Sequence, residues 1–274
     1  MVAPATETLL ARVTSGKRAK RMVAILDLIE ESGSISLNRL AATLAISTAT
    51  ARRDLSDLAE QNLIVRTHGG ASAVDRGIEL PVALRDTRHQ DSKRAIARAM
   101  VDRLPPERYV IALCGGTTTA SVARELAHHR DIAVVTNSLT IAGLLSAYPG
   151  VRVVMTGGFL RPQSLELVGA LAESTFNSVN VGTAILGADG ITAEAGITTH
   201  DETEARTNHA MVSKAKRTVV VADGSKIGRD ALAQCCAIGE IDVLITDTTA
   251  DAEEVRRIRD AGVEVVQVST PSEP

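Results

Sequence analysis

Apolar residues recur every three or four positions near the start of the chain, and this period predicts three short helices. The first begins at Lys17 and ends at Ser32-Gly33. The second follows Ser36, which suits a helix N-cap, and the third follows the tight turn Ala45-Ile46-Ser47. The apolar positions are, in chain order, Met22, Ile25, Leu26, Ile29, Leu37, Leu40, Ala41, Leu44, Ala51, Leu55 and Leu58.

A short β-rich segment completes this region. Asn62 tolerates the left-handed backbone that a turn requires, and it precedes the run LIVRTH at 63–68, which Gly69-Gly70 stops. Three short helices and a small hairpin are typical of a winged helix-turn-helix. We predict this domain over residues 17–72, with a flexible arm at 1–16 and a linker at 73–91.

Helical and strand patterns alternate through the rest of the chain, residues 92–274. Such alternation predicts an α/β domain with a mostly parallel sheet and helices on both faces. Two helical patterns lie at 119–127 and 252–261. The apolar runs expected to form buried strands are 109–113, 132–136, 151–155, 182–186, 218–222, 242–246 and 263–268.

Length and composition agree with two intracellular domains. A chain of 274 residues accommodates one small and one larger domain. No apolar run approaches the roughly 18 residues of a membrane span, and the N-terminus lacks the apolar core of a secretory signal. Three cysteines make no disulfide framework, so we expect a cytoplasmic protein without a membrane partner.

The net charge of −3 is unevenly distributed along the chain. Residues 1–70 hold nine Lys or Arg against seven Asp or Glu, whereas residues 71–274 hold 21 against 26. Local clusters of positive charge attract phosphate more than the total does. The four aromatic residues all lie outside the basic region, which disfavours recognition of single strands by base stacking.

The third predicted helix carries the features of a DNA-reading helix. Ser47 caps its N-terminus, where free amides favour a phosphate, and an inward apolar face turns Arg52 and Arg53 outward. In isolation two such arginines would be read as solvated, but the preceding helix, turn and wing favour double-stranded operator DNA as partner. The candidate DNA-contacting residues are Arg21, Ser36, Ser47, Thr48, Thr50, Arg52, Arg53, Arg66 and His68.

Glycines and hydroxyls follow the first strand of the larger domain. The segment Cys114–Thr119 lies between a predicted strand and a predicted helix, where backbone amides and hydroxyls form a phosphate cradle. A tight turn uses the same residue types, so this turn alone is weak support. Polar residues also follow other strands, and their convergence on one sheet edge indicates a ligand site. These residues are Gly115, Gly116, Thr117, Thr118, Thr119, Asn137, Ser138, Gly158, Arg161, Asp189 and Lys226.

Both regions resemble the DeoR family of sugar-responsive regulators. In the first, Arg52-Arg53-Asp54-Leu55 and His68-Gly69-Gly70 stand at the family's marked positions. The second, over about 78–268, resembles the family's sensor domain, whose fold is similar to ribose-5-phosphate isomerase. Its matching pieces are GGTTT (115–119), TNS (136–138), GG-x-LRP (157–162), LVG (167–169), GADGI (187–191), GITT (196–199) and DGSKIG (223–228).

The resemblance implies a repressor controlled by a phosphorylated sugar or related metabolite. The cradle would hold the phosphate, Arg161 and Lys226 would supply positive charge, and Asp189 or Glu204 would accept sugar hydroxyls. Cys114 and Asn208 depart from the family, which commonly has Asp and Lys there. These departures favour an altered ligand preference or a decayed pocket.

Two further readings stay open at this point: a sugar-phosphate isomerase with a DNA-binding appendage, and a DNA-binding protein whose pocket has decayed. We favour a regulator that is not an enzyme. No cysteine or histidine spacing matches a zinc pattern, so we expect no metal and no cofactor. Paired half-sites on DNA favour a homo-oligomer, a dimer or tetramer, assembled through residues 92–274.

Overall fold

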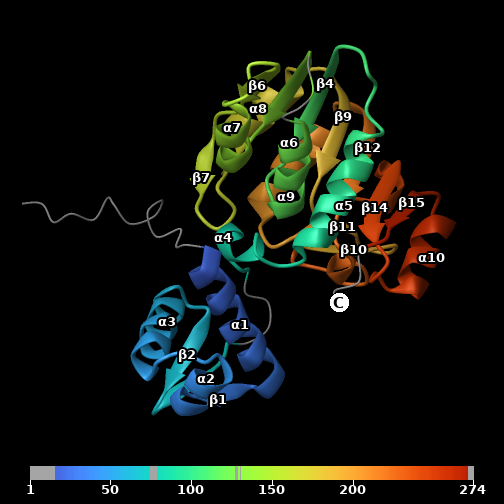
Figure 1. Ribbon diagram of the computed structural model, residues 1–274. Helices are drawn as coiled ribbons and strands as arrows, with labels where there is room; N and C mark the ends of the chain where they lie inside the picture. The colour runs from blue at the N-terminus through green and yellow to red at the C-terminus, as the bar shows by residue number, and fades with distance from the viewer. Residues whose placement is uncertain (1–15, 75–78, 127–128, 130, 271–274) are drawn as a thin grey trace, which may run out of the picture. The chain divides into compact units, whose positions relative to one another are not determined.

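The computed structural model describes residues 16–74, 79–126, 129 and 131–270. The chain forms two compact units, residues 1–88 and 89–274 (Figure 1). Of the arm predicted at 1–16, residues 1–15 lie outside the described part, and Gly16 is the first residue of a helix.

The first unit is a winged helix-turn-helix, as predicted. Its helices are α1 (Gly16–Ser32), α2 (Leu37–Thr43) and α3 (Thr48–Glu60). An antiparallel sheet in the order β1-β3-β2 forms the wing from β1 (Ser34–Ser36), β2 (Ile64–Thr67) and β3 (Gly70–Ala73). Strand β1 was not predicted, because three residues with a single apolar side chain show no period.

Local sequence signals set the ends of these helices. The Ser36 hydroxyl accepts the Arg39 amide, and the Ser47 hydroxyl accepts the Thr50 amide, so both predicted N-caps are confirmed. Asn62 has φ of 58°, the predicted left-handed conformation. The predicted inner face of α3 (Ala51, Leu55 and Leu58) is buried in the core of the unit.

A buried carboxylate joins α1 to α3. Arg21 contacts both Asp54 oxygens, with Nε 2.6 Å from Oδ2 and Nη2 3.2 Å from Oδ1. The Arg18 Nε lies 3.3 Å from Oδ1. The Asp54 side chain is only 2% exposed, so these guanidinium groups replace the water that the carboxylate loses on folding.

Part of the predicted linker belongs to the first unit. Residues 82–85 form the short helix α4 (Val82–Arg85), and Leu84 lies in the winged-helix core. Arg88 forms an ion pair with Asp27 of α1. The linker prediction rested on the absence of a clean period, and a helix of four residues is too short to show one.

The second unit is built on a seven-stranded parallel sheet, which confirms the predicted α/β class. The strand order is β15-β14-β12-β9-β4-β5-β6, and each predicted run became one of these strands. Their bounds are β4 (Tyr109–Leu113), β5 (Ile132–Thr136), β6 (Val151–Met155), β9 (Val181–Leu186), β12 (Ala215–Val221), β14 (Val243–Asp247) and β15 (Glu264–Val268).

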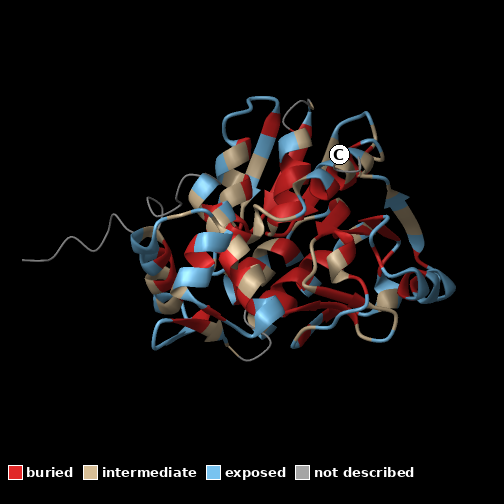
Figure 2. Cartoon of the chain, turned by 60° about the horizontal axis from the view of Figure 1, so that its bottom comes forward, coloured by how far each residue is buried: buried red, intermediate tan, exposed pale blue. Residues whose placement is uncertain are grey.

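Helices cover both faces of this sheet, and alternate strand residues enter two separate cores. In β4, Ile111 and Leu113 pack with α5 (Gln90–Val101), α6 (Thr117–Leu126) and α7 (Leu139–Leu145). Ala112 and Cys114 face the other core, which includes residues of α8 (Ala170–Asn177), α9 (Glu202–Val212) and α10 (Ala252–Asp260). Figure 2 shows the burial that results along the central strands.

Two small antiparallel sheets and two 3-10 turns complete the unit, and none of them was predicted. The strands are β7 (Phe159–Arg161), β8 (Glu166–Val168), β10 (Gly190–Thr192), β11 (Gly196–Thr199) and β13 (Ala233–Cys236), and the turns are η1 (Gly224–Lys226) and η2 (Ile238–Glu240). Strand β7 pairs with β8, and β11 lies between β10 and β13. No helix in the described residues is long and apolar enough to cross a membrane.

The Asp54 contacts generate a stability prediction. The substitution Asp54→Asn removes a buried charge that two arginines bind, and we expect it to lower the free energy of unfolding by about 2 kcal/mol. In the full chain, amides of α3 should then exchange hydrogen roughly 30-fold faster. The control is Asp57→Asn, which touches only the part-exposed Arg18 and should cost less than about 1 kcal/mol. Equal exchange in both variants would contradict the assignment.

Candidate effector site and DNA-binding surface

The strand order places a topological switch point between β4 and β9. From β4 the chain moves through β5 to β6, whereas from β9 it moves the opposite way through β12, β14 and β15. Ligands of open α/β sheets bind beyond the carboxyl ends of the strands at such a point. Cys114 joins the two strand ends, because its amide donates to Ile185 O at 3.3 Å and its Sγ accepts the Gly187 amide at 3.2 Å.

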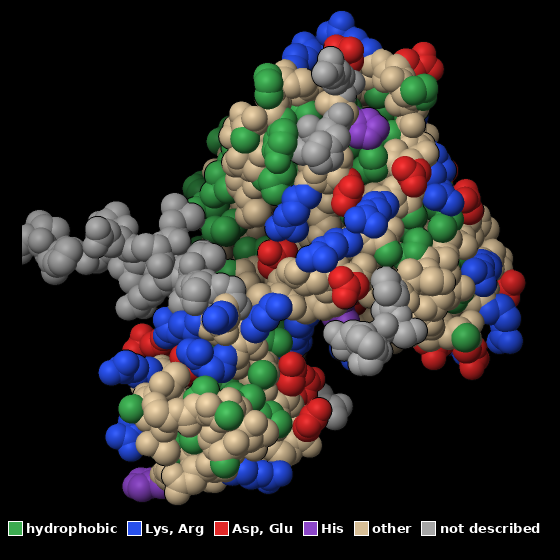
Figure 3. Space-filling model, in the orientation of Figure 1, with side chains coloured by type: hydrophobic (Ala, Val, Ile, Leu, Met, Phe, Trp, Pro, Cys, Tyr) green, Lys and Arg blue, Asp and Glu red, His purple; other side chains and the backbone are tan. Residues whose placement is uncertain are grey.

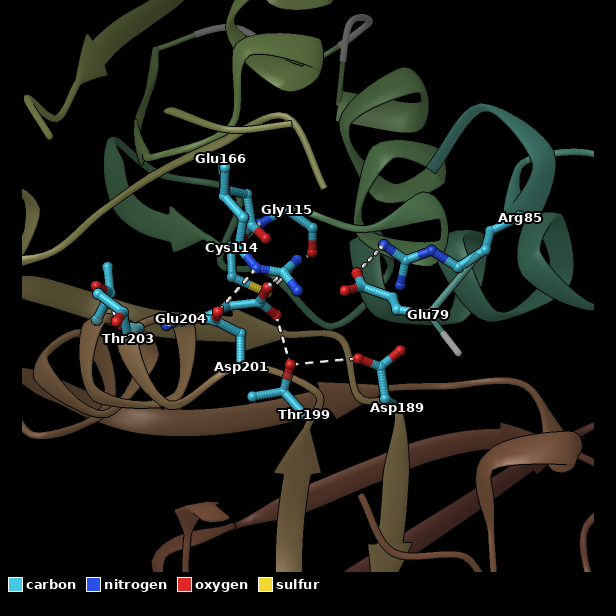
Figure 4. A network of polar contacts seen from close by, with 12 residues as sticks. Glu79, Arg85, Cys114, Gly115, Glu166, Asp189, Thr199, Asp201, Thr203 and Glu204 are labelled. Carbon is cyan, nitrogen blue, oxygen red and sulfur yellow. Dashed lines mark hydrogen bonds and ion pairs between the residues drawn. The ribbon is translucent and has the colours of Figure 1, made fainter. Parts of the chain in front are cut away.

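The glycine turn after β4 receives a carboxylate from β8. The Gly115 amide donates to Glu166 Oε1 at 2.6 Å, and both residues are buried (Figure 4). Gly116 has φ of +120°, a conformation that favours glycine. Helix α6 starts at Thr117, two residues earlier than predicted, so Thr117 and Thr118 stand in its first turn. The Thr119 hydroxyl donates to the Gly116 carbonyl at 3.1 Å.

Arg161, from β7, binds two acids at the start of α9. Its Nη1 lies 3.0 Å from Glu204 Oε2, and its Nε lies 3.4 Å from Asp201 Oδ2. Asp201 caps α9 by accepting the Glu204 amide at 2.8 Å. Burial by itself would raise the pKa of Asp201, but the α9 amides and the Arg161 charge lower it.

Thr199, at the end of β11, joins this pair to a second one. Its hydroxyl lies 2.7 Å from Glu204 Oε1 and 3.2 Å from Asp189 Oδ2. Asp189 in turn lies 3.9 Å from Lys226 Nζ. Glu166, which accepts the Gly115 amide, is the strand-pairing partner of Arg161 between β8 and β7. We call this whole set of residues the switch-point network: Gly115, Arg161, Glu166, Asp189, Thr199, Asp201, Glu204 and Lys226.

Burial and like charges act on the acids of this network. Burial raises the pKa of Glu204 well above its usual value, and the charges of Glu166 and Asp189 add to the effect. The Thr199 hydrogen bond and the Arg161 charge oppose it. Burial and the Glu166 charge also raise the pKa of Cys114, which is therefore a neutral bridging thiol rather than a nucleophile.

The remaining predicted effector residues, Asn137, Ser138 and Gly158, follow the ends of β5 and β6. Ser138 caps α7 by accepting the Ile141 amide at 3.4 Å. A Cβ at Gly158 would collide with the Val168 backbone, so packing alone requires glycine there. The Asn137 side chain is fully buried, and neither of its polar atoms has a hydrogen-bond partner in the described structure. Such an amide is costly unless it binds something.

Three members of the switch-point network were not predicted: Glu166, Thr199 and Asp201. Glu166 interrupts the apolar pattern of SLELVG, and a charged residue between apolar neighbours is the signal that could have found it. Asp201 precedes a helical pattern as an N-cap does. Nothing local distinguishes Thr199 from other strand threonines.

The candidate DNA-contacting residues of the winged helix differ in their exposure to solvent. Ser47, Thr48, Arg52 and Arg53 are exposed at the N-terminal half of α3, whereas Thr50 is half-buried and shares a hydrogen bond with Ser47. Figure 3 shows Lys and Arg side chains in several groups on the visible face of this unit. The other exposed candidates are Ser36, Arg66 and His68.

Two of the arginine candidates already have side-chain partners in the protein. Arg21 binds Asp54, and that hydrogen bond raises the pKa of its guanidinium. Arg66 donates to Ser56 Oγ at 2.8 Å from an exposed position on β2. Contact with DNA stays a prediction for both, but Arg21 has a structural role that its sequence position did not suggest.

A cavity of about 500 Å³ lies away from the predicted site, between α8, α9 and β13. Arg206, His209 and Cys235 contribute to its walls, and no predicted effector residue does. The switch-point network is the better candidate for the effector site than this cavity, because strand ends and charged side chains converge there. Within the described part of the chain, no three His, Cys, Asp or Glu side chains are grouped so as to hold a metal ion.

A winged helix-turn-helix combined with an α/β unit defines a DNA-binding transcription regulator, and the comparisons agree. Residues 21–76 match the DeoR-like helix-turn-helix domain, and residues 88–248 match the DeoR C-terminal sensor domain. The chain therefore belongs to the DeoR family of transcriptional repressors.

Named relatives span nearly the whole chain. It is 36% identical over 253 residues to a putative aga operon transcriptional repressor of Escherichia coli O157:H7, covering 91% of this chain and 94% of that protein. It is 29% identical over 249 residues to the glycerol-3-phosphate regulon repressor of Escherichia coli K12, covering 91% and 98%.

Ribose 5-phosphate isomerase A from Methanocaldococcus jannaschii is similar at 18% identity and a TM-score of 0.38, covering 52% of this chain and 55% of that one. The α/β assignment rests on the strand order instead.

The raised pKa of Glu204 predicts how stability changes with pH. As pH rises from the unfolded pKa towards the folded one, the native state retains a proton that the unfolded state loses, so stability falls. Glu204→Gln does not titrate, so its unfolding free energy relative to the parent should rise with pH. The expected slope is about 1.4 kcal/mol per pH unit between the two pKa values.

Urea unfolding of the full chain between pH 5 and 8 measures this difference. Glu202→Gln is the matched control, because Glu202 is exposed in the first turn of the same helix. Its difference from the parent should not vary with pH. A pH-independent difference for Glu204→Gln would show that the carboxylate is ionised throughout.

Proposed function

We propose that this protein represses genes of carbohydrate metabolism and that a phosphorylated sugar or related metabolite controls its DNA binding. The observation that carries the proposal is the switch-point network, in which a glycine turn, a helix start, two cations and several acids converge beyond β4 and β9. One similar protein is named for a glycerol-3-phosphate regulon, which supports a phosphorylated effector here.

In this proposal the first turn of α6 binds the phosphate. The Gly116 and Thr117 amides and the Thr117 and Thr118 hydroxyls donate hydrogen bonds, and the helix dipole favours an anion there. Arg161 and Lys226 neutralise the remaining charge. Asp189 and Glu204 accept hydrogen bonds from hydroxyls of the sugar. Both acids already accept the Thr199 hydroxyl, so their oxygens lie close enough together to bind one ligand.

Helix α3 enters the major groove of the operator. Its capped N-terminus lies against a phosphate, and the exposed Arg52 and Arg53 reach base edges or backbone. An effector changes operator affinity only by its differential affinity for the DNA-competent and the released conformations. Two winged helices on paired half-sites supply workable specificity, so we propose a homo-oligomer held together by residues 92–274.

We also propose that the sensor unit binds its ligand without turnover. Isomerisation needs a base that is free to take a proton from the substrate. The best-placed carboxylate, Glu204, is held by Thr199 and Arg161.

Removing the two exposed arginines of α3 tests the DNA-binding surface. Arg52→Ala with Arg53→Ala should weaken operator binding by about 1–3 kcal/mol for each base-reading side chain, with looser sequence preference. The measurement is a titration of operator DNA at matched salt. Arg256→Ala with Arg257→Ala, exposed on α10, is the charge-matched control and should bind as the parent does. If the α3 variant binds operator DNA as tightly as the parent, Arg52 and Arg53 do not contact the DNA.

Thr117→Val tests the phosphate position. Valine keeps the shape of threonine but cannot donate, so the effector should bind about 1–2 kcal/mol more weakly while operator affinity without effector is retained. Calorimetry with pentose and hexose phosphates, beside operator titrations, measures both. Thr218→Val, buried in β12 outside the network, is the control. If no phosphorylated sugar binds the parent, the proposed effector class is wrong.

A further inference from the structure

Glu166 holds the Gly115 amide, which directly precedes the Gly116 and Thr117 amides of the proposed phosphate site. We propose that Glu166 is a specificity-determining residue, whose carboxylate competes for the Gly115 amide and makes the site reject free phosphate while admitting phosphorylated ligands that bring further contacts. This inference rests on the proposed effector site.

The first glycine of the turn is explained by this carboxylate. Gly116 has a positive φ, which accounts for glycine at that position, but no such φ occurs at Gly115. A Cβ at Gly115 would instead collide with the Glu166 carboxyl group. The turn is therefore shaped to let the Glu166 side chain reach a backbone amide, at 2.6 Å.

The backbone around Glu166 is tied to the end of β5. The Leu167 amide donates to the Asn137 carbonyl at 2.8 Å, and the Leu139 amide donates to the Leu165 carbonyl at 3.0 Å. Glu166 itself forms a β-bridge with Ser138. Since its main chain is held on both sides, displacement of the carboxylate from the Gly115 amide would be a side-chain movement rather than a movement of β8.

Competition follows from the chemistry of the turn. A carboxylate on an amide makes the same charge-assisted hydrogen bond that a phosphate oxygen would make. Free phosphate thus gains little by replacing Glu166, and it meets the repulsion of the Glu166 charge as well. A phosphorylated sugar also offers hydroxyls to Asp189 and Glu204, and these contacts can offset the displacement of the carboxylate.

Inorganic phosphate is the probe for this inference. We expect weak phosphate binding to the full-length parent and roughly 10- to 100-fold tighter binding to Glu166→Ser, which uncovers the amide. Glu166→Gln keeps an acceptor for the Gly115 amide but loses the charge, so we expect its phosphate affinity to lie between those of the parent and Glu166→Ser. Glu202→Gln, exposed on α9, should match the parent. Calorimetry measures affinity, and operator binding with thermal melting reports that each variant is folded.

The outcomes separate this inference from the proposed function. Adding Thr117→Val to Glu166→Ser should abolish the gain, which locates the phosphate at the α6 turn. If the parent and the Glu166 variants bind phosphate equally, or no variant binds it, then Glu166 does not exclude free phosphate from the site. That conclusion holds even if a sugar phosphate releases the parent from operator DNA. If the variants gain phosphate binding but no sugar phosphate affects operator binding, the filter stands and the proposed effector class fails.

Discussion

Parallel pairing between β4 and β9 organises the sensor unit. Because the two strands are neighbours in the sheet while the chain leaves them in opposite directions, the connections after them diverge and their ends stay uncovered by a crossover helix. The Cys114 thiol then joins the two ends by accepting the Gly187 amide. A carboxylate at this position would place another negative charge beside Glu166. The neutral thiol avoids that repulsion.

The switch-point network is acidic for a site that is proposed to bind an anion. Its four acids face two cations, and Glu204 and Glu166 are both buried. Buried charges are tolerated when each has a partner of fixed geometry. Here the partners are the Gly115 amide, the Thr199 hydroxyl and the Arg161 guanidinium, drawn from different parts of the unit (Figure 4). An entering ligand must rearrange these contacts, and that requirement is a physical basis for selectivity.

The arginines of the winged helix fall into two groups, one bound to a buried acid and one exposed to solvent. Arg18 and Arg21 of α1 bind the buried Asp54, whereas Arg52 and Arg53, directly before Asp54 in the chain, remain exposed. With Ala51, Leu55 and Leu58 buried, Arg52 and Arg53 face solvent and Asp54 faces the arginines of α1. A cluster of basic residues in a sequence can thus contain both arginines that bind a buried acid and arginines that stay exposed.

Much of the fold could be predicted from the sequence, because apolar period and cap chemistry are local. Helices α1, α2 and α3, the caps Ser36 and Ser47, and all seven strands of the main sheet follow from them. The glycine turn after β4 was likewise visible as a candidate site. The small sheets and helix α4 were not predicted, because elements of three or four residues carry no measurable period. Only the tertiary structure placed Glu166 on the Gly115 amide and Arg21 on Asp54. Those contacts join residues 51 and 33 positions apart, and no local pattern encodes which distant charge will meet a buried polar group.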